Sequence, residues 1–263
     1  MKIISIKAFR GRNIYSHKKC IRLNLDLEGY SETPSKDISN FNEKLVCMLP
    51  ELENHRCGID EDRGFIKRLT EGTYLAHITE HIILAFHNMI GVKLSYGKAR
   101  EISGENYYVI YQYEYKNTGI EVAKIAVDLI NSLVNGCAFN LNLRLIRLKE
   151  ILVDEKLGVS TINICAEAKK MGIPILRIGE NSMFQLGYGK YSKMIQATLG
   201  NDTSAISVNI AQDKLLTKKM LSIHLLPVAM GMEVDSMEGL IENAKDIGYP
   251  VVLKPQFGNQ GKG

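Results

Sequence analysis

The sequence predicts an α+β domain over residues 1–155 and an α/β region over residues 156–263. Two observations predict the first part. Residues 19–30, "KCIRLNLDLEGY", alternate apolar and polar side chains as a half-buried strand does, and residues 119–134 repeat apolar side chains with the period of a helix. The charged segment 147–161 ends in Gly-Val-Ser-Thr, and helix and strand patterns alternate after it, so we place the domain boundary there.

The remaining elements of the first domain follow from local patterns. The N-terminal segment alternates as a strand until Gly11, and "YYVIYQYEY" is rich in aromatic and β-branched residues. A polar, glycine-containing loop is predicted over residues 54–64. The predicted strands are 1–10, 19–30 and 107–115, and the predicted helices are 41–52, 73–89 and 119–134.

In the second region a helix stops at Gly172, and Pro174 leads into a strand. Residues 203–229 predict a strand followed by a helix. Residues 237–247 predict a helix closed by glycine, and a buried strand, 250–254, is expected to lead into the glycine-rich end.

Composition excludes several classes of protein. The 263 residues are 45% apolar, which is enough for one large domain or two modest ones, and the net charge of +4 is too small and diffuse to indicate nucleic-acid binding. The sequence has no apolar run long enough to cross a membrane and no signal-peptide pattern. Its five scattered cysteines, without a C-x-x-C pair, predict reduced thiols and a cytoplasmic location.

The last ten residues, "KPQFGNQGKG", suggest an anion site. Gly258, Gly261 and Gly263 free the backbone to approach a ligand, and Lys254 and Lys262 add positive charge. The spacing matches neither a Walker A loop nor a dinucleotide-binding fingerprint. A flexible linker would have a similar composition, so both interpretations stay open.

Several separated motifs resemble one family. A strand, Lys-Pro and a glycine-rich loop resemble the nucleotide-covering loop of ATP-grasp ligases. "STINICAEAKKMGIP", "QLGYGKYSKMIQAT", "DKLLTK" and "GYPVVLKPQFGNQGKG" are similar, in that order, to the start of the ATP-grasp domain of cyanophycin synthetases. "RGRNIYS", "GFIKRLTEGTYLAHITEHI" and "YYVIYQYEYKNTG" resemble the N-terminal domain of the same family. The second region is therefore expected to be an incomplete ATP-grasp N-terminal lobe.

The resemblance implies an ATP- and Mg²⁺-dependent ligase that builds a poly-aspartate backbone bearing arginine side groups through acyl phosphates. It also implies a homo-oligomer, and an N-terminal domain that holds the polymer and in some members cuts it with a metal. By motif match, the residues expected to contact ATP are Lys218, Lys254, Gly258, Asn259, Gly261, Lys262 and Gly263.

The sequence ends inside the glycine-rich loop, before the carboxylates that would hold Mg²⁺ and before the Mur-ligase-like domain of the family. A phosphoryl-transfer site without these groups stabilises little charge. We therefore expect residues 1–263 not to ligate by themselves, and to bind ATP more weakly than about 1 mM.

The stretch "AHITEH" predicts a metal site. His77 and His81 are four residues apart on a predicted helix, so both lie on one face, and Glu80 could act as general base on a zinc-bound water. The alternative is a helix that packs on a sheet and happens to carry histidines. A zinc enzyme needs a third protein ligand. His55, His87 and Glu114 are possible, and Glu121 is preferred.

Arginines near the loop-like segments are candidates for polymer binding, because guanidinium groups pair with carboxylates. They are Arg10, Arg12, Arg63 and Arg68. A solvated charged face is the alternative for each. For the whole chain, two functions compete with the ligase: a stand-alone zinc hydrolase of a peptide polymer, and a non-catalytic module that binds such a polymer.

Overall fold

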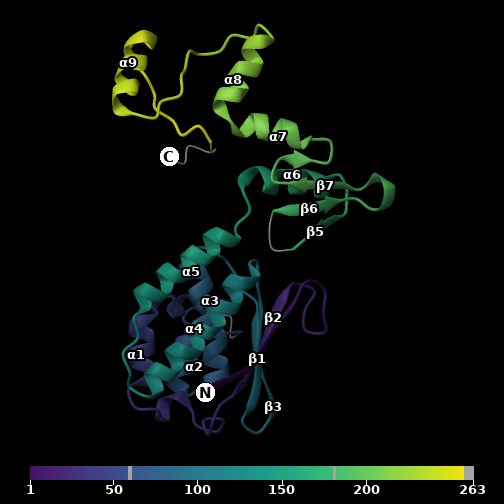
Figure 1. Cartoon of the computed structure of the whole chain (residues 1–263). Helices are drawn as coiled ribbons and strands as arrows, with labels where there is room; N and C mark the ends of the chain where they lie inside the picture. Colours follow the sequence, from purple (N-terminus) through teal and green to yellow (C-terminus); the bar gives the residue numbers. More distant parts are fainter. Residues whose placement is uncertain (59–60, 180–181, 258–263) are drawn as a thin grey trace. The chain divides into compact units, whose positions relative to one another are not determined.

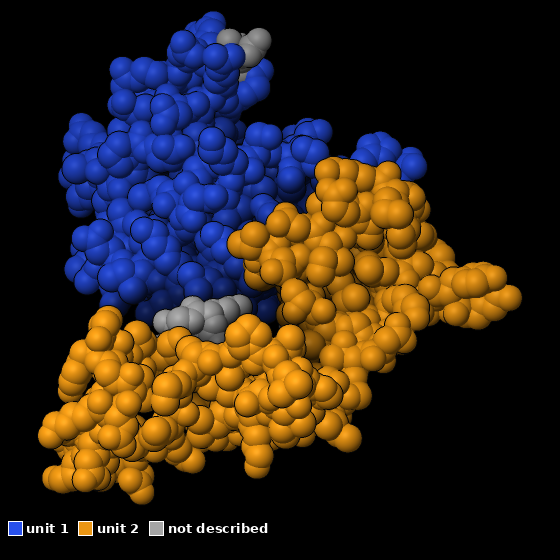
Figure 2. Space-filling view, turned by 90° about the horizontal axis from the view of Figure 1, so that it is seen from above, with its two compact units in different colours: residues 1–156 blue, residues 157–263 orange. Residues whose placement is uncertain are grey.

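The computed structural model describes residues 1–58, 61–179 and 182–257. The chain forms two compact units, residues 1–156 and 157–263, shown in blue and orange in Figure 2. Each unit contains an antiparallel sheet and helices, so the expected mixed α and β fold is confirmed (Figure 1). No helix among the described residues is long and apolar enough to cross a membrane.

Unit 1 is built on a four-stranded antiparallel sheet with the order β1-β2-β4-β3. The strands are β1 (Lys2–Phe9), β2 (Cys20–Asp26), β3 (Gly97–Ser103) and β4 (Asn106–Gln112). The alternation that predicted β2 sends Ile21, Leu23 and Leu25 into the core, where all three are fully buried. Its alternate residues face the other side of the sheet.

Five helices lie on one side of this sheet (Figure 1). They are α1 (Phe41–Met48), α2 (Gly64–Glu71), α3 (Leu75–Met89), α4 (Lys116–Val134) and α5 (Leu141–Glu155), with short 3₁₀ segments η1 (Ser35–Asp37) and η2 (Pro50–Asn54). Helices α3 and α4 pack against the strands, and α1 and α5 pack against α4. Helix α3 is apolar on nearly all sides because it lies among the sheet, α4 and η2. This position buries His81 and His87 and leaves His77 half-buried.

Glu155, at the end of α5, ties the end of unit 1 to the start of α4. Its Oε1 accepts a hydrogen bond from the Asn117 N–H at 2.8 Å, and its Oε2 accepts from the Thr118 N–H at 2.8 Å and the Thr118 hydroxyl at 2.9 Å. A carboxylate at a helix N-terminus satisfies free N–H groups and opposes the helix dipole. The predicted boundary segment 147–161 therefore begins inside a helix.

Unit 2 contains a second antiparallel sheet with the order β5-β6-β7-β8. Its strands are β5 (Ile175–Arg177), β6 (Met183–Leu186), β7 (Lys193–Gln196) and β8 (Leu199–Gly200). Its helices are α6 (Val159–Lys170), α7 (Ala205–Gln212), α8 (Lys214–Ile223) and α9 (Met237–Ile247), with a 3₁₀ turn, η3 (Gly189–Tyr191).

Two of the predicted strands in unit 2 are wrong. The strand expected at the start of residues 203–229 is helix α7, whose first N–H groups are capped when the Ser204 hydroxyl accepts a hydrogen bond from Ser207. Residues 250–254 form no strand and are not a buried segment, since Val252 is 76% exposed. Among the described residues, the nearest ladder contact is a single bridge between Asp213 and Phe257.

Candidate metal centre

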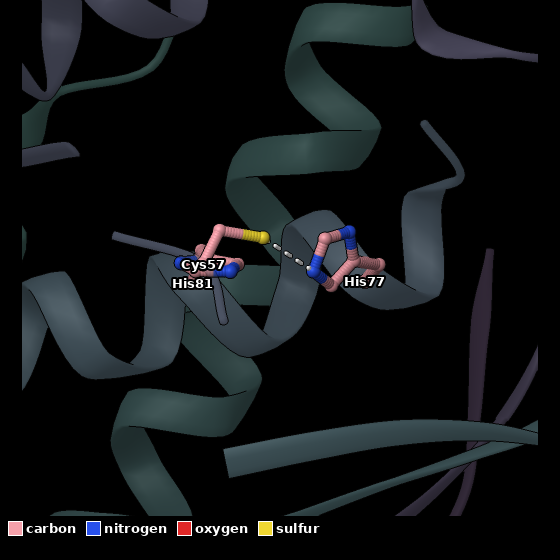
Figure 3. Close-up of side chains that lie close together, drawn as sticks. All are labelled: Cys57, His77 and His81. Atoms are coloured by element: carbon pink, nitrogen blue, oxygen red, sulfur yellow. Dashed lines mark hydrogen bonds between the residues drawn. The ribbon is translucent and has the colours of Figure 1, made fainter. Parts of the chain in front are cut away.

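Helix α3 places His77 and His81 one turn apart, as their spacing predicts, and a third metal-binding side chain comes from elsewhere. Cys57 lies in the loop after η2, and its Sγ is hydrogen-bonded to His77 Nε2 at 3.2 Å (Figure 3). Ligand atoms of Cys57, His77 and His81 all lie within 4.8 Å of one another. We call these three residues the Cys-His-His cluster.

Neighbouring side chains fix the two imidazole rings. His77 Nδ1 lies 2.8 Å from the Thr73 hydroxyl, and His81 Nδ1 lies 2.8 Å from Nδ1 of His55. The ring of Phe65 stacks on His81, with the ring centroids 3.9 Å apart. Because each Nδ1 is engaged, the Nε2 atoms remain for a metal, which is the usual arrangement when outer partners orient histidine ligands.

The protonation states suit metal binding at neutral pH. Burial lowers the pKa of His77 to about 4, with a smaller contribution from Arg68, and burial lowers the pKa of His81 to about 2. Burial also lowers the pKa of His55. All three rings are therefore neutral at pH 7, the form that ligates a metal. Burial raises the pKa of the Cys57 thiol, so an incoming cation would have to displace its proton.

The donor set fits a zinc ion. One sulfur and two imidazole nitrogens are ligands that Zn²⁺ commonly takes, at about 2.3 Å and about 2.0–2.1 Å. Tetrahedral ligands at these lengths are separated by about 3.3–3.7 Å, and the observed separations reach 4.8 Å at most. Small side-chain movements would therefore complete the set.

Glu80 lies on the same helix, α3, but its side chain is directed towards strand β3. A Cβ built on Gly97 would lie 2.6 Å from Glu80 Cγ, so the carboxyl stem occupies the space that this glycine leaves. Burial raises the pKa of Glu80 to about 7, against smaller opposing effects of a hydrogen bond from the Ala99 backbone and of the charges of Arg100 and Lys98. Glu80 also raises the pKa of Cys57 slightly, so its carboxyl group lies within electrostatic range of the cluster.

Of the other expected ligands, His55 lies beside the cluster, with its Nδ1 2.8 Å from that of His81, whereas Glu121, His87 and Glu114 lie elsewhere. The Glu121 carboxylate faces Lys124 Nζ at 3.2 Å and Arg147 Nε at 3.5 Å. His87 is buried, and its Nδ1 donates to the Ile83 carbonyl at 2.7 Å. Glu114 is exposed after β4. The third donor is Cys57, which sequence reasoning missed; its only local signal was its position two residues after a histidine.

The arginines expected to contact polymer fall in two places. Arg10 and Arg12 are exposed in the loop between β1 and β2. Arg63 precedes α2 and forms an ion pair with Glu53, with Nη2 2.7 Å from Oε1, and Arg68 is exposed on α2. They do not form one continuous group along the chain.

The residues expected at the ATP site are only partly described. Lys218 Nζ donates to the Met230 carbonyl at 3.1 Å, and Lys254 is exposed. Lys214, which the sequence did not single out, donates to the Pro255 carbonyl at 2.8 Å, immediately before the glycine-rich end. The remaining expected contacts lie outside the described residues: Gly258, Asn259, Gly261, Lys262 and Gly263.

Comparison with known proteins shows what this chain is similar to. Residues 22–135 match the family described as "Cyanophycin synthase-like N-terminal domain", and residues 213–263 match "Carbamoyl-phosphate synthase L chain, ATP binding domain". The whole chain aligns with the cyanophycin synthetase of Geminocystis herdmanii at 39% identity. The chain is a homologue of the cyanophycin synthetases. It is 37% identical to the enzyme of a Synechocystis strain, again over its full length.

The chain spans 31% of the length of these cyanophycin synthetases. A relative of another kind is the carbamoyl phosphate synthase large chain of Clostridium acetobutylicum, which is 33% identical over 98 residues, 37% of this chain and 9% of the relative. The two family matches, over residues 22–135 and 213–263, follow the expected order, a cyanophycin synthetase N-terminal domain and then the start of an ATP-grasp domain.

Proposed function

We propose that this chain serves as the N-terminal part of an ATP-dependent ligase that builds an aspartate–arginine polymer. Unit 1 would hold the polymer, and unit 2 would contribute to the ATP site. The observation that carries the proposal is the alignment of the whole chain, at 39% identity, with a cyanophycin synthetase. A homo-oligomeric state and a cytoplasmic location are part of the same proposal.

The chemistry of such a ligase explains why the two units belong together. ATP activates a carboxylate as an acyl phosphate, and an amine then attacks it, so the end of the polymer has to stay near the nucleotide. In unit 2 the candidate contacts with phosphate are Lys214, Lys218 and Lys254. Ammonium groups of this kind stabilise phosphate charge.

The deciding experiment is ADP release by the protein expressed from its whole reading frame, with aspartate, arginine and a polymer primer. ADP formation that requires aspartate and primer is expected. ATP hydrolysis that is independent of both amino acids would reject the ligase. Sedimentation of residues 1–263 with the insoluble polymer tests whether this part of the protein binds the polymer, the role proposed for unit 1.

A second candidate function, metal-dependent cleavage of the polymer, is favoured by the Cys-His-His cluster. Cys57, His77 and His81 would hold the ion, and Thr73 would keep one ring in place. A bound Zn²⁺ supplies a Lewis acid that lowers the pKa of a coordinated water. Glu80, with a pKa of about 7, has the proton affinity that suits a general base at neutral pH, although its stem packs on β3.

Metal analysis tests this candidate. After dialysis against a weak chelator, the protein should retain about one zinc per chain, as a three-ligand site would. His77→Ala and Cys57→Ser should weaken zinc binding by more than the roughly 10–100-fold that loss of an outer partner costs. The matched controls, His17→Ala and Cys47→Ser, remove exposed residues outside the cluster and should leave binding unchanged.

A third variant separates a catalytic metal from a structural one. Glu80→Gln should keep the zinc and abolish cleavage, because an amide cannot take a proton from water. A structural metal would leave any cleavage unaffected by this change. If the wild-type protein takes up no zinc, cobalt or manganese at micromolar concentration, the site is rejected.

A further inference from the structure

In the part of unit 1 that the structure describes, one face of the sheet carries no helix of that unit. Helices α1 to α5 lie on the opposite face (Figure 1), and the β-strand alternation that buries Ile21 and Leu23 turns Arg22 and Asn24 to this open face. The strand register then shows which residues of the neighbouring strands share the face with them.

The open face carries a row of positive charges. Lys7 of β1 lies opposite Arg22 of β2, Arg22 lies opposite Ile110 of β4, and Ile110 lies opposite Lys98 of β3. The next row brings Arg100 of β3 beside Tyr108. We call Lys7, Arg22, Lys98 and Arg100 the open-face cations. Arg22 is half-buried and the other three are exposed.

The guanidinium group of Arg22 is held in a fixed position. Its Cζ lies 5.5 Å from the ring centroid of Tyr15 and 4.8 Å from that of Tyr108. Its Nε donates to the Asn24 side chain at 2.8 Å, and it also donates to the Tyr15 hydroxyl. Tyr96 in turn donates to the Tyr15 carbonyl at 2.7 Å. A planar cation held in this way loses little conformational freedom when an anion binds.

The open-face cations lack a direct carboxylate partner in the part of the chain that the structure describes, although Lys98 and Arg100 lie within electrostatic range of the buried Glu80. The acidic residue of β2, Asp26, lies at the far end of the strand, opposite Lys2. Like charges directly opposite each other on neighbouring strands are destabilising. The Lys7–Arg22 pair therefore works against the sheet unless an anion lies between its members.

We propose that the open-face cations form a docking surface for an extended acidic peptide, whose carboxylates bridge the strands. The row from Lys7 to Lys98 crosses three strand spacings, about 14 Å, which about four residues of extended peptide can cover. Arg22 already occupies ring faces of Tyr15 and Tyr108, which leaves less aromatic surface for stacked bases and favours carboxylates over single-stranded nucleic acid.

This inference rests on the proposed function for the natural ligand, a polymer with an aspartate backbone. It differs in location from the arginines that the sequence singled out, because Arg63 immediately precedes α2 and Arg68 lies on it, whereas Arg10 and Arg12 lie in the loop between β1 and β2. The open face can therefore be tested separately from polymer binding as such.

The test uses residues 1–263 and a fluorescent poly-aspartate peptide of about ten residues, long enough to cross the four strands. Fluorescence anisotropy at low salt measures binding, because screening weakens exposed charges. The double variant Lys7→Gln/Lys98→Gln should bind about tenfold more weakly, through loss of two charge-assisted contacts. The matched control, Lys44→Gln/Lys149→Gln, removes the same charge from exposed helical positions and should change affinity less than about twofold.

The outcomes separate this inference from the function on which it rests. If both double variants weaken binding equally, or if neither weakens it, the open-face cations are not the docking surface, and polymer binding by unit 1 still stands. Failure of the wild-type chain to bind poly-aspartate would overturn both. Tighter binding of an oligothymidylate than of poly-aspartate would overturn the choice of ligand. Arg22→Lys keeps the charge but removes the planar fork, so it should also weaken binding; unchanged affinity would reject the role of the stacked guanidinium.

Discussion

Replacing Glu80 by glutamine should stabilise the protein at alkaline pH and have little effect at acidic pH. Glutamine keeps the shape of the side chain and an oxygen that can accept from Ala99, but it cannot ionise. Burial raises the pKa of Glu80 from 4.5 to about 7, so the folded state holds its proton more tightly than the unfolded state does. Folding stability is therefore lost as the pH rises from 4.5 through 7.

The magnitude follows from the size of the pKa change. A change from 4.5 to about 7 corresponds to about 3 kcal/mol of unfolding free energy, at 1.36 kcal/mol per unit. This penalty is complete above pH 7 and absent below pH 4.5, so Glu80→Gln should raise the unfolding free energy by about 3 kcal/mol at pH 8.5 and by only a few tenths at pH 4.

Urea unfolding at the two pH values, with EDTA present to exclude metals, measures the difference. Glu150→Gln provides the control, because this carboxylate is exposed on α5 and its loss should change stability by less than about 0.5 kcal/mol at either pH. An equal effect of Glu80→Gln at both pH values, or destabilisation at alkaline pH, would refute the assignment of a buried carboxyl group with a raised pKa.

Two further predictions concern packing and capping in unit 1. Gly97→Ala should destabilise by about 1–3 kcal/mol, because its Cβ would meet a buried side-chain carbon at 2.6 Å, whereas Gly11→Ala, with nothing within 4 Å, should be nearly neutral. A Gly97→Ala protein as stable as the wild type in urea would show that this contact is not tight. Glu155→Gln should cost about 1–2 kcal/mol, because it weakens charge-assisted hydrogen bonds to the α4 N-terminus. The same urea curves should show almost no change for Glu150→Gln, and similar curves for both variants would contradict the capping role.

Local patterns predicted the helix α3 and the strand β2 because both depend on a short period. His77 and His81 share a face for the same reason, since residues four apart are neighbours on any helix. The motif order also predicted the family, which the comparisons confirm. Helix α2 and strand β3 were missed, because their patterns are short and their burial depends on partners distant in sequence.

Local patterns failed where the outcome depended on a partner. An apolar run such as residues 250–254 forms a strand only when another strand pairs with it, and the described residues provide no such partner. Residues 203–212 are apolar enough to form either a strand or a helix. In the structure they form helix α7, and the Ser204 hydroxyl caps its first turn.

The sequence by itself determined the spacing of the histidines, the core face of the central strands and the resemblance to cyanophycin synthetases. Only the tertiary structure decided what surrounds them. Cys57 reaches His77 across 20 residues of chain, and the Glu80 side chain packs on Gly97 of strand β3. The row of open-face cations likewise comes from three strands. Such groupings depend on chain packing and strand register, which bring together residues that no local period relates.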